Sequence, residues 1–161
     1  LAFANEQDDR THYLRTLPEE GRRLRRALEQ AQAAGICQLE VRTNATLSDI
    51  RDVFRNHDNR IAVFHFGGHA DSYRLLFEAA GGKRAVIDAA GFAEFLAHQA
   101  GLQLVFLNAC STAALQAAGV PVIIVHSGKP EIVLTEIAQL SDFPQSDGAS
   151  RLTRCRYLTG L

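Results

Sequence analysis

The chain contains two apolar stretches that end in polar residues, Ile61-Ala-Val-Phe-His65-Phe-Gly-Gly-His69-Ala70 and Leu104-Val-Phe-Leu-Asn108-Ala-Cys110-Ser-Thr112. Apolar runs this continuous are typical of strands that are buried on both faces, as in a parallel sheet. Reactive groups gather just beyond the carboxyl ends of such strands. We therefore expect His69 and Cys110, which follow the two runs, to lie at the same edge of one sheet.

The rest of the chain alternates between helix and strand patterns. We expect strands at 1–4, 36–41, 61–66, 102–107 and 122–125, helices at 18–34, 46–54, 89–99 and 112–118, and a hairpin of 73–79 with 84–87. Gly35 suits a helix end, and residues 46–49 resemble a capping box. Strands that alternate with helices predict an α/β fold, a three-layer sandwich with a mostly parallel central sheet.

Length and composition favour one domain over residues 1–161. Residues 1–140 carry the regular patterns, whereas 141–161 show no convincing period, and we expect that tail to be loosely ordered. The chain has 17 basic and 18 acidic residues, a formal net charge of −1, which gives no electrostatic reason to expect nucleic acid or membrane as a partner. The basic run at 22–26 is interpreted as a solvated helix face.

The termini and cysteines indicate the cellular setting. The first residues lack the basic and apolar regions of a signal peptide, and they lack an initiator Met, so we interpret the chain as a fragment that begins inside a first strand. The three cysteines, an odd number without regular spacing, argue against a disulfide framework. We expect a cytoplasmic protein, and we interpret Cys37 as a core residue.

Cys110 and His69 are the candidate catalytic residues. A thiolate nucleophile needs a nearby base, and a Cys and a His that are distant in sequence but adjacent in the fold supply both. Gly67 and Gly68 would permit an unusual backbone path and a close approach of substrate. The backbone N–H groups of Gly68, Ala70 and Cys110 are candidates to stabilise an oxyanion. This chemistry needs no cofactor.

Each of these residues also has a purely structural interpretation. Cys110 could be a buried cysteine at a strand end, and His69 a loop histidine. His65 is interpreted as a satisfied core histidine that could orient its neighbours, and Asn108 as a residue that fixes a turn. Two histidines without a third ligand are a weak metal signal, so no metal site is expected.

The two stretches resemble a known family. His-Phe-Gly-Gly-His-Ala at 65–70 is similar to the histidine motif of caspase-like cysteine peptidases, in particular the CHAT domains found beside tetratricopeptide repeats. Asn-Ala-Cys-Ser-Thr-Ala at 108–113 resembles the cysteine motif of the same group, and the resemblance extends to about residue 124. Ala70 departs from the pattern, because the family usually has Gly there.

The resemblance implies a caspase-like fold, here incomplete at its C-terminus, and a cysteine endopeptidase that hydrolyses peptide bonds in protein substrates. It also implies an adjoining repeat or sensor region as a partner. Two alternatives stay open. One is a catalytically inactive caspase-like module that only binds partners, which Ala70 and the atypical tail would suit. The other is a small-molecule enzyme or nucleotide binder of doubly wound type that uses Gly67 and Gly68, although no G-x-G-x-x-G or P-loop is present.

Overall fold

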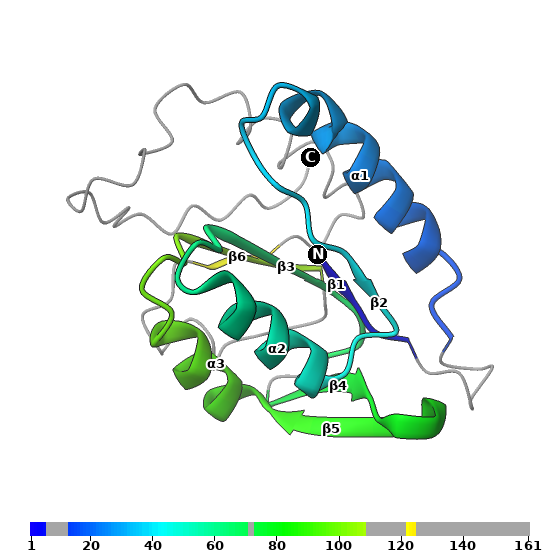
Figure 1. Cartoon of the computed structure of the whole chain (residues 1–161). Coiled ribbons are helices and arrows are strands. Elements are labelled where there is room, and N and C mark those ends of the chain that lie inside the picture. The colour runs from blue at the N-terminus through cyan, green and yellow to red at the C-terminus, as the bar shows by residue number, and fades with distance from the viewer. Residues whose placement is uncertain (6–12, 71–72, 109–121, 125–161) are drawn as a thin grey trace.

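The computed structural model describes residues 1–5, 13–70, 73–108 and 122–124 (Figure 1). Cys110, the helix expected at 112–118 and the tail at 141–161 lie outside these ranges. Within the described ranges, no helix combines the length and the apolar character that crossing a bilayer requires.

The centre of the fold is a parallel sheet. Its strands, in spatial order, are β2 (Arg42–Thr43), β1 (Ala2–Phe3), β3 (Val63–Gly67), β6 (Leu104–Asn108) and β7 (Val122–Ile124). Every neighbouring pair in this sheet is parallel. The mostly parallel α/β fold expected from the sequence is therefore confirmed.

Helices cover both faces of the sheet. They are α1 (Leu17–Ala33), α2 (Leu47–His57) and α3 (Ala89–Ala97), with a short 3₁₀ turn, η1 (Ala80–Gly82), in the hairpin of β4 (Arg74–Glu78) and β5 (Arg84–Asp88). In Figure 1, α1 lies on one side of the sheet, and α2 and α3 lie together on the other. This arrangement gives the expected three layers, and the expected hairpin is confirmed.

The larger core lies between the sheet and the pair α2 and α3. Along β3, alternate side chains point to opposite faces. Phe64 and Phe66 pack into the larger core, whereas His65 points to the α1 side, where Phe3 and Leu24 are buried. Each fully buried side chain of this size contributes roughly 1.5–3 kcal/mol of hydrophobic stabilisation.

Two of the helices begin at N-cap residues that the sequence indicates. The Thr46 side chain accepts a hydrogen bond from the Asp49 N–H, and the Asp49 carboxylate accepts one from the Thr46 N–H, so the expected capping box at α2 is confirmed. Asp88 accepts a hydrogen bond from the Gly91 N–H at 2.7 Å and begins α3. Such caps typically stabilise a helix by about 1 kcal/mol each.

The strand expected at 36–41 is wrong. The structure forms a strand only at Arg42–Thr43, and Cys37, expected in the core, is exposed in the loop before it. The register places Arg42 opposite Ala2 of β1, and the Glu40 carbonyl just before it accepts a hydrogen bond from the Leu1 nitrogen at 2.7 Å. The described strand pairing on this side of β1 is therefore limited to Arg42–Thr43.

The strand order contains a switch point. From β1 the chain crosses over α1 to β2 on one side, and then returns over α2 to β3 on the other side of β1. The crossovers beside this point therefore use opposite faces of the sheet. In open α/β sheets, ligands bind outside the carboxyl ends of the strands at such a point. The end of β3, which leads to His69, lies beside it.

Candidate functional site

His69 lies two residues beyond β3 and is half-buried. Its backbone carbonyl accepts a hydrogen bond from the Leu76 N–H at 3.0 Å, and Ala70 forms an antiparallel bridge with Leu75. The first strand of the hairpin therefore fixes the backbone of His69 at the end of the sheet. A cavity of about 10 Å³ adjoins it, and its lining is Ala4, Asn5, His69, Leu76, Phe77 and Arg84.

Gly67 and Gly68 are required for close packing of the chain against itself. Neither has a positive φ. A Cβ on Gly68 would lie 2.9 Å from the carbonyl oxygen of Ala4 and 2.7 Å from the Phe66 ring, and a Cβ on Gly67 would lie 2.9 Å from Phe3. The two glycines thus bring the end of β3 against β1 and α1, whereas the sequence had suggested an unusual backbone path.

The register of β3 and β6 bears on the candidate catalytic pair. Gly67 is paired with Asn108 across these parallel strands. His69 follows Gly67 by two residues, and Cys110 follows Asn108 by two residues. The described strands therefore end level with each other at one edge of the sheet. Cys110 itself lies outside the described residues, and its proximity to His69 stays a prediction.

A buried polar cluster lies under the ends of β3 and β6. It consists of Glu20 from α1, His65 from β3 and Asn108 from β6. The Glu20 carboxylate accepts a hydrogen bond from His65 Nε2 at 3.0 Å on one oxygen, and one from Asn108 Nδ2 at 2.6 Å on the other. Glu20 is 8% exposed and His65 is fully buried. A single carboxylate therefore ties the helix to both strands that lead to the candidate pair.

The environment of His65 keeps its ring neutral. Burial lowers the pKa of His65, and this effect outweighs the hydrogen bond and the charge of Glu20, which raise it. Because a carboxylate only accepts, the proton sits on Nε2, and Nδ1 is buried without a hydrogen-bond partner. The ring packs between Phe3 and Phe106, with centroids 5.4 and 5.1 Å away. His65 thus fits the interpretation as a core histidine.

Metal binding finds no support in this part of the chain. Among the residues that the structure describes, no group of three or more His, Cys, Asp or Glu side chains is placed to hold an ion. One ring nitrogen of His65, Nε2, is hydrogen-bonded to Glu20, and the other, Nδ1, is buried without a partner among the described residues. The described site therefore offers acid–base and hydrogen-bonding groups.

Sequence reasoning did not find Glu20. Pro18, Glu19 and Glu20 begin the helix, and acidic residues are common there because the helix dipole favours them. The spacing of Leu17, Glu20 and Leu24, by three and then four residues, places Glu20 on the buried stripe of the helix. That spacing was the signal in the sequence that could have identified Glu20, because a charged residue on the apolar stripe of a helix needs a buried partner.

Fold and site together define a class: a parallel α/β domain in which a histidine follows one strand at the switch point and a cysteine follows the next. Comparison with family models identifies the family. The CHAT domain model matches residues 1–137, most of the chain, and the chain belongs to this caspase-like family. A search of curated proteins found no match.

Proposed function

We propose that the chain is a cysteine endopeptidase domain, with Cys110 as the nucleophile and His69 as the general base and acid. The single observation that carries the proposal is the register of β3 and β6, because it pairs the residues two positions before His69 and Cys110. Membership of the CHAT family supplies the reaction class. The switch point beside β3 is where ligands bind in sheets of this kind.

The proposed reaction proceeds through a thioester. His69 takes the proton of the Cys110 thiol, and the thiolate attacks the scissile carbonyl carbon. The tetrahedral intermediate collapses as the C–N bond breaks, and His69 gives its proton to the leaving amine. Water then attacks the thioester, His69 accepts the water's proton, and cleavage of the C–S bond releases the acid and restores the thiol. The backbone N–H groups of Gly68, Ala70 and Cys110 are the proposed oxyanion donors.

The proposal also names a substrate class, a compartment and a partner. The substrate is a protein or peptide in the cytoplasm, where a reduced thiol persists. An adjoining repeat or sensor region of the parent protein is the proposed partner. Neither nucleic acid nor membrane is part of the proposal, and the reaction requires no cofactor.

One observation favours the alternative, a binding module without catalytic activity. The cavity beside His69 has a volume of about 10 Å³, which is room for about one water molecule and too little for a peptide side chain. A catalytic site must open there when substrate binds, whereas a binding module need not.

Peptide turnover separates the two functions. The experiment measures cleavage of a pooled, internally quenched peptide library by the wild-type chain and by Cys110→Ala, His69→Ala and Cys37→Ala variants. We expect cleavage by the wild type and by Cys37→Ala, because Cys37 is exposed in the loop before the start of β2, whereas His69 follows the end of the parallel strand β3. We expect none by the other two. Equal cleavage by wild type and Cys110→Ala would refute the proposal, and absence of cleavage by all four would favour the binding module.

A further inference from the structure

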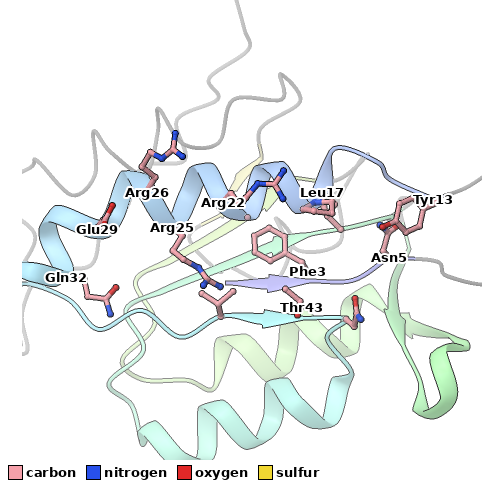
Figure 2. A pocket seen from close by; sticks show the side chains of 14 residues that line it. Phe3, Asn5, Tyr13, Leu17, Arg22, Arg25, Arg26, Glu29, Gln32 and Thr43 are labelled. Carbon is pink, nitrogen blue, oxygen red and sulfur yellow. The ribbon is translucent and has the colours of Figure 1, made fainter.

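A groove between α1 and β2 has no part in the proposed peptidase chemistry. Its volume is about 620 Å³, within the size range of ligand sites. Arg22, Arg25 and Arg26 line it from the helix. Thr43 of β2 and Val41, which precedes that strand, line it from the opposite side. Figure 2 shows Arg25 directed from α1 toward β2, with Phe3 between the helix and the sheet.

The groove carries an excess of positive charge. Arg22, Arg25 and Arg26 are exposed, and no carboxylate among the described residues pairs with any of them. Arg23 differs, because it lies off the groove and pairs with Glu19 on the preceding turn. Glu29 is the one acidic residue among the described residues that line the groove. A concave site with unpaired charges of one sign attracts ligands of the opposite sign.

The length of the groove matches an extended peptide. It follows α1 from Pro18 to Gln32, which is about 21 Å at 1.5 Å per residue. A peptide in strand conformation covers that length with about six residues. Arg22 and Arg26 are about 6 Å apart along the helix axis, and alternate side chains of a strand are separated by about 6.6 Å. Alternate acidic side chains would therefore meet successive arginines.

The opposite wall can receive such a peptide. β2 pairs with β1 on one side and is the last strand of the described sheet on the other. The backbone N–H of Arg42 donates a hydrogen bond to the Leu1 carbonyl, on the side of β1. Because the backbone groups of successive strand residues point to opposite sides, the N–H and C=O groups of Thr43 point away from β1. An exposed strand edge adds an extended peptide through main-chain hydrogen bonds.

We propose that this groove binds an acidic segment of a partner protein in extended conformation. Its carboxylates, on alternate residues, pair with Arg22 and Arg26, and its backbone runs along β2. The groove lies on the α1 face of the sheet and shares Asn5 with the lining of the cavity beside His69. The proposal does not depend on peptidase activity.

The test uses a fluorescein-labelled peptide of alternating Glu and Val residues with the full chain, measured by fluorescence anisotropy. We expect saturable binding that weakens with salt. Arg22→Gln combined with Arg26→Gln should raise Kd roughly tenfold, as expected for two partly exposed ion pairs. The matched control, Arg23→Gln with Arg51→Gln, removes the same charge outside the groove and should change Kd by less than about twofold.

Hydrogen exchange provides a second readout, since bound peptide should slow exchange of the Thr43 amide. Three results would overturn the proposal. The first is that the groove variant and the control variant weaken peptide binding equally. The second is that a peptide with Gln in place of Glu binds as tightly as the Glu peptide. The third is binding of inorganic pyrophosphate without any binding of the peptide, which would indicate a site for small anions.

Discussion

Removal of the Glu20 carboxylate should destabilise the fold far more than removal of its neighbour Glu19. The Glu20 side chain is buried and accepts hydrogen bonds from His65 and Asn108, which belong to two strands. The Glu19 side chain is about half exposed, and its one ion-pair partner among the described residues is Arg23 on the next turn of the same helix. The two positions therefore compare a buried and an exposed carboxylate on one helical turn.

The structure sets the size of the effect. Hydrogen bonds to a charged group are worth about 1.5–3 kcal/mol each. Glu20→Ala removes two of them and leaves the His65 N–H buried without an acceptor, whereas Asn108 is half-buried and can turn toward water. We expect a loss of about 3–4 kcal/mol in the free energy of unfolding. Glu20→Gln keeps one acceptor oxygen and should cost about 1–2 kcal/mol, and Glu19→Ala about 0–1 kcal/mol.

Urea unfolding followed by circular dichroism at pH 7 measures all three variants against the wild type. The order of stability should be Glu19→Ala, then Glu20→Gln, then Glu20→Ala as the least stable. If Glu20→Ala lies within about 0.5 kcal/mol of Glu19→Ala, an amount typical of surface substitutions, the reasoning about the buried cluster is refuted.

Three further outcomes follow from the described residues. Gly68→Ala should lose about 1–3 kcal/mol of stability, because the added Cβ would meet the Ala4 carbonyl. Gly91→Ala should be neutral or stabilising, because Gly91 lies inside α3 and an added Cβ would have its nearest contact at 3.5 Å. Thermal melts of the two variants check this, and equal effects on stability would contradict it. Burial lowers the folded-state pKa of His65, so the unfolded state binds more protons as the pH falls through about 6.5. The free energy of unfolding should therefore drop by roughly 1 kcal/mol between pH 7.5 and 5.5 on account of His65. His65→Gln should remove that part of the slope in urea titrations at the two pH values, and an unchanged slope would show that His65 does not titrate this way. Asp49→Ala should lower the free energy of unfolding by about 1 kcal/mol, because it removes the capping box. Asp52→Ala on the same helix removes only an exposed ion pair with Arg55 and should lower it less. Thermal melts of both variants measure this, and an equal loss of stability would contradict the role of the cap.

Much of the fold was predictable because its signals are local or periodic. The box at Thr46 and Asp49 and the Asp88 cap each satisfy N–H groups within one turn, so a few residues are enough to identify them. The continuous apolar runs identified β3 and β6, and their order in the chain placed both in one parallel sheet. Parallel strands end at a common edge, so the position of His69 followed as well.

The rest depended on partners that are distant in sequence. Residues 36–41 alternate like a strand, yet the described pairing with β1 comprises Arg42 and Thr43, and the register between two strands cannot be deduced from the alternation within one of them. Glu20 lies near a helix start, where an acidic residue is common for local reasons, but its role comes from His65 and Asn108, 45 and 88 residues away. Gly68 was expected to make room for substrate, and it makes room for the Ala4 carbonyl.

The pH dependence of Cys110 alkylation tests the central claim most directly. The measurement uses iodoacetamide and the full chain with Cys37→Ser and Cys155→Ser, so that Cys110 is the one remaining thiol. A cysteine activated by His69 should react with an apparent pKa clearly below the value of about 8.5 of a free thiol, and His69→Gln should return that pKa toward 8.5. The same profile with and without His69, or a Cys110 that does not react at all, would contradict a nucleophile and base at this edge of the sheet.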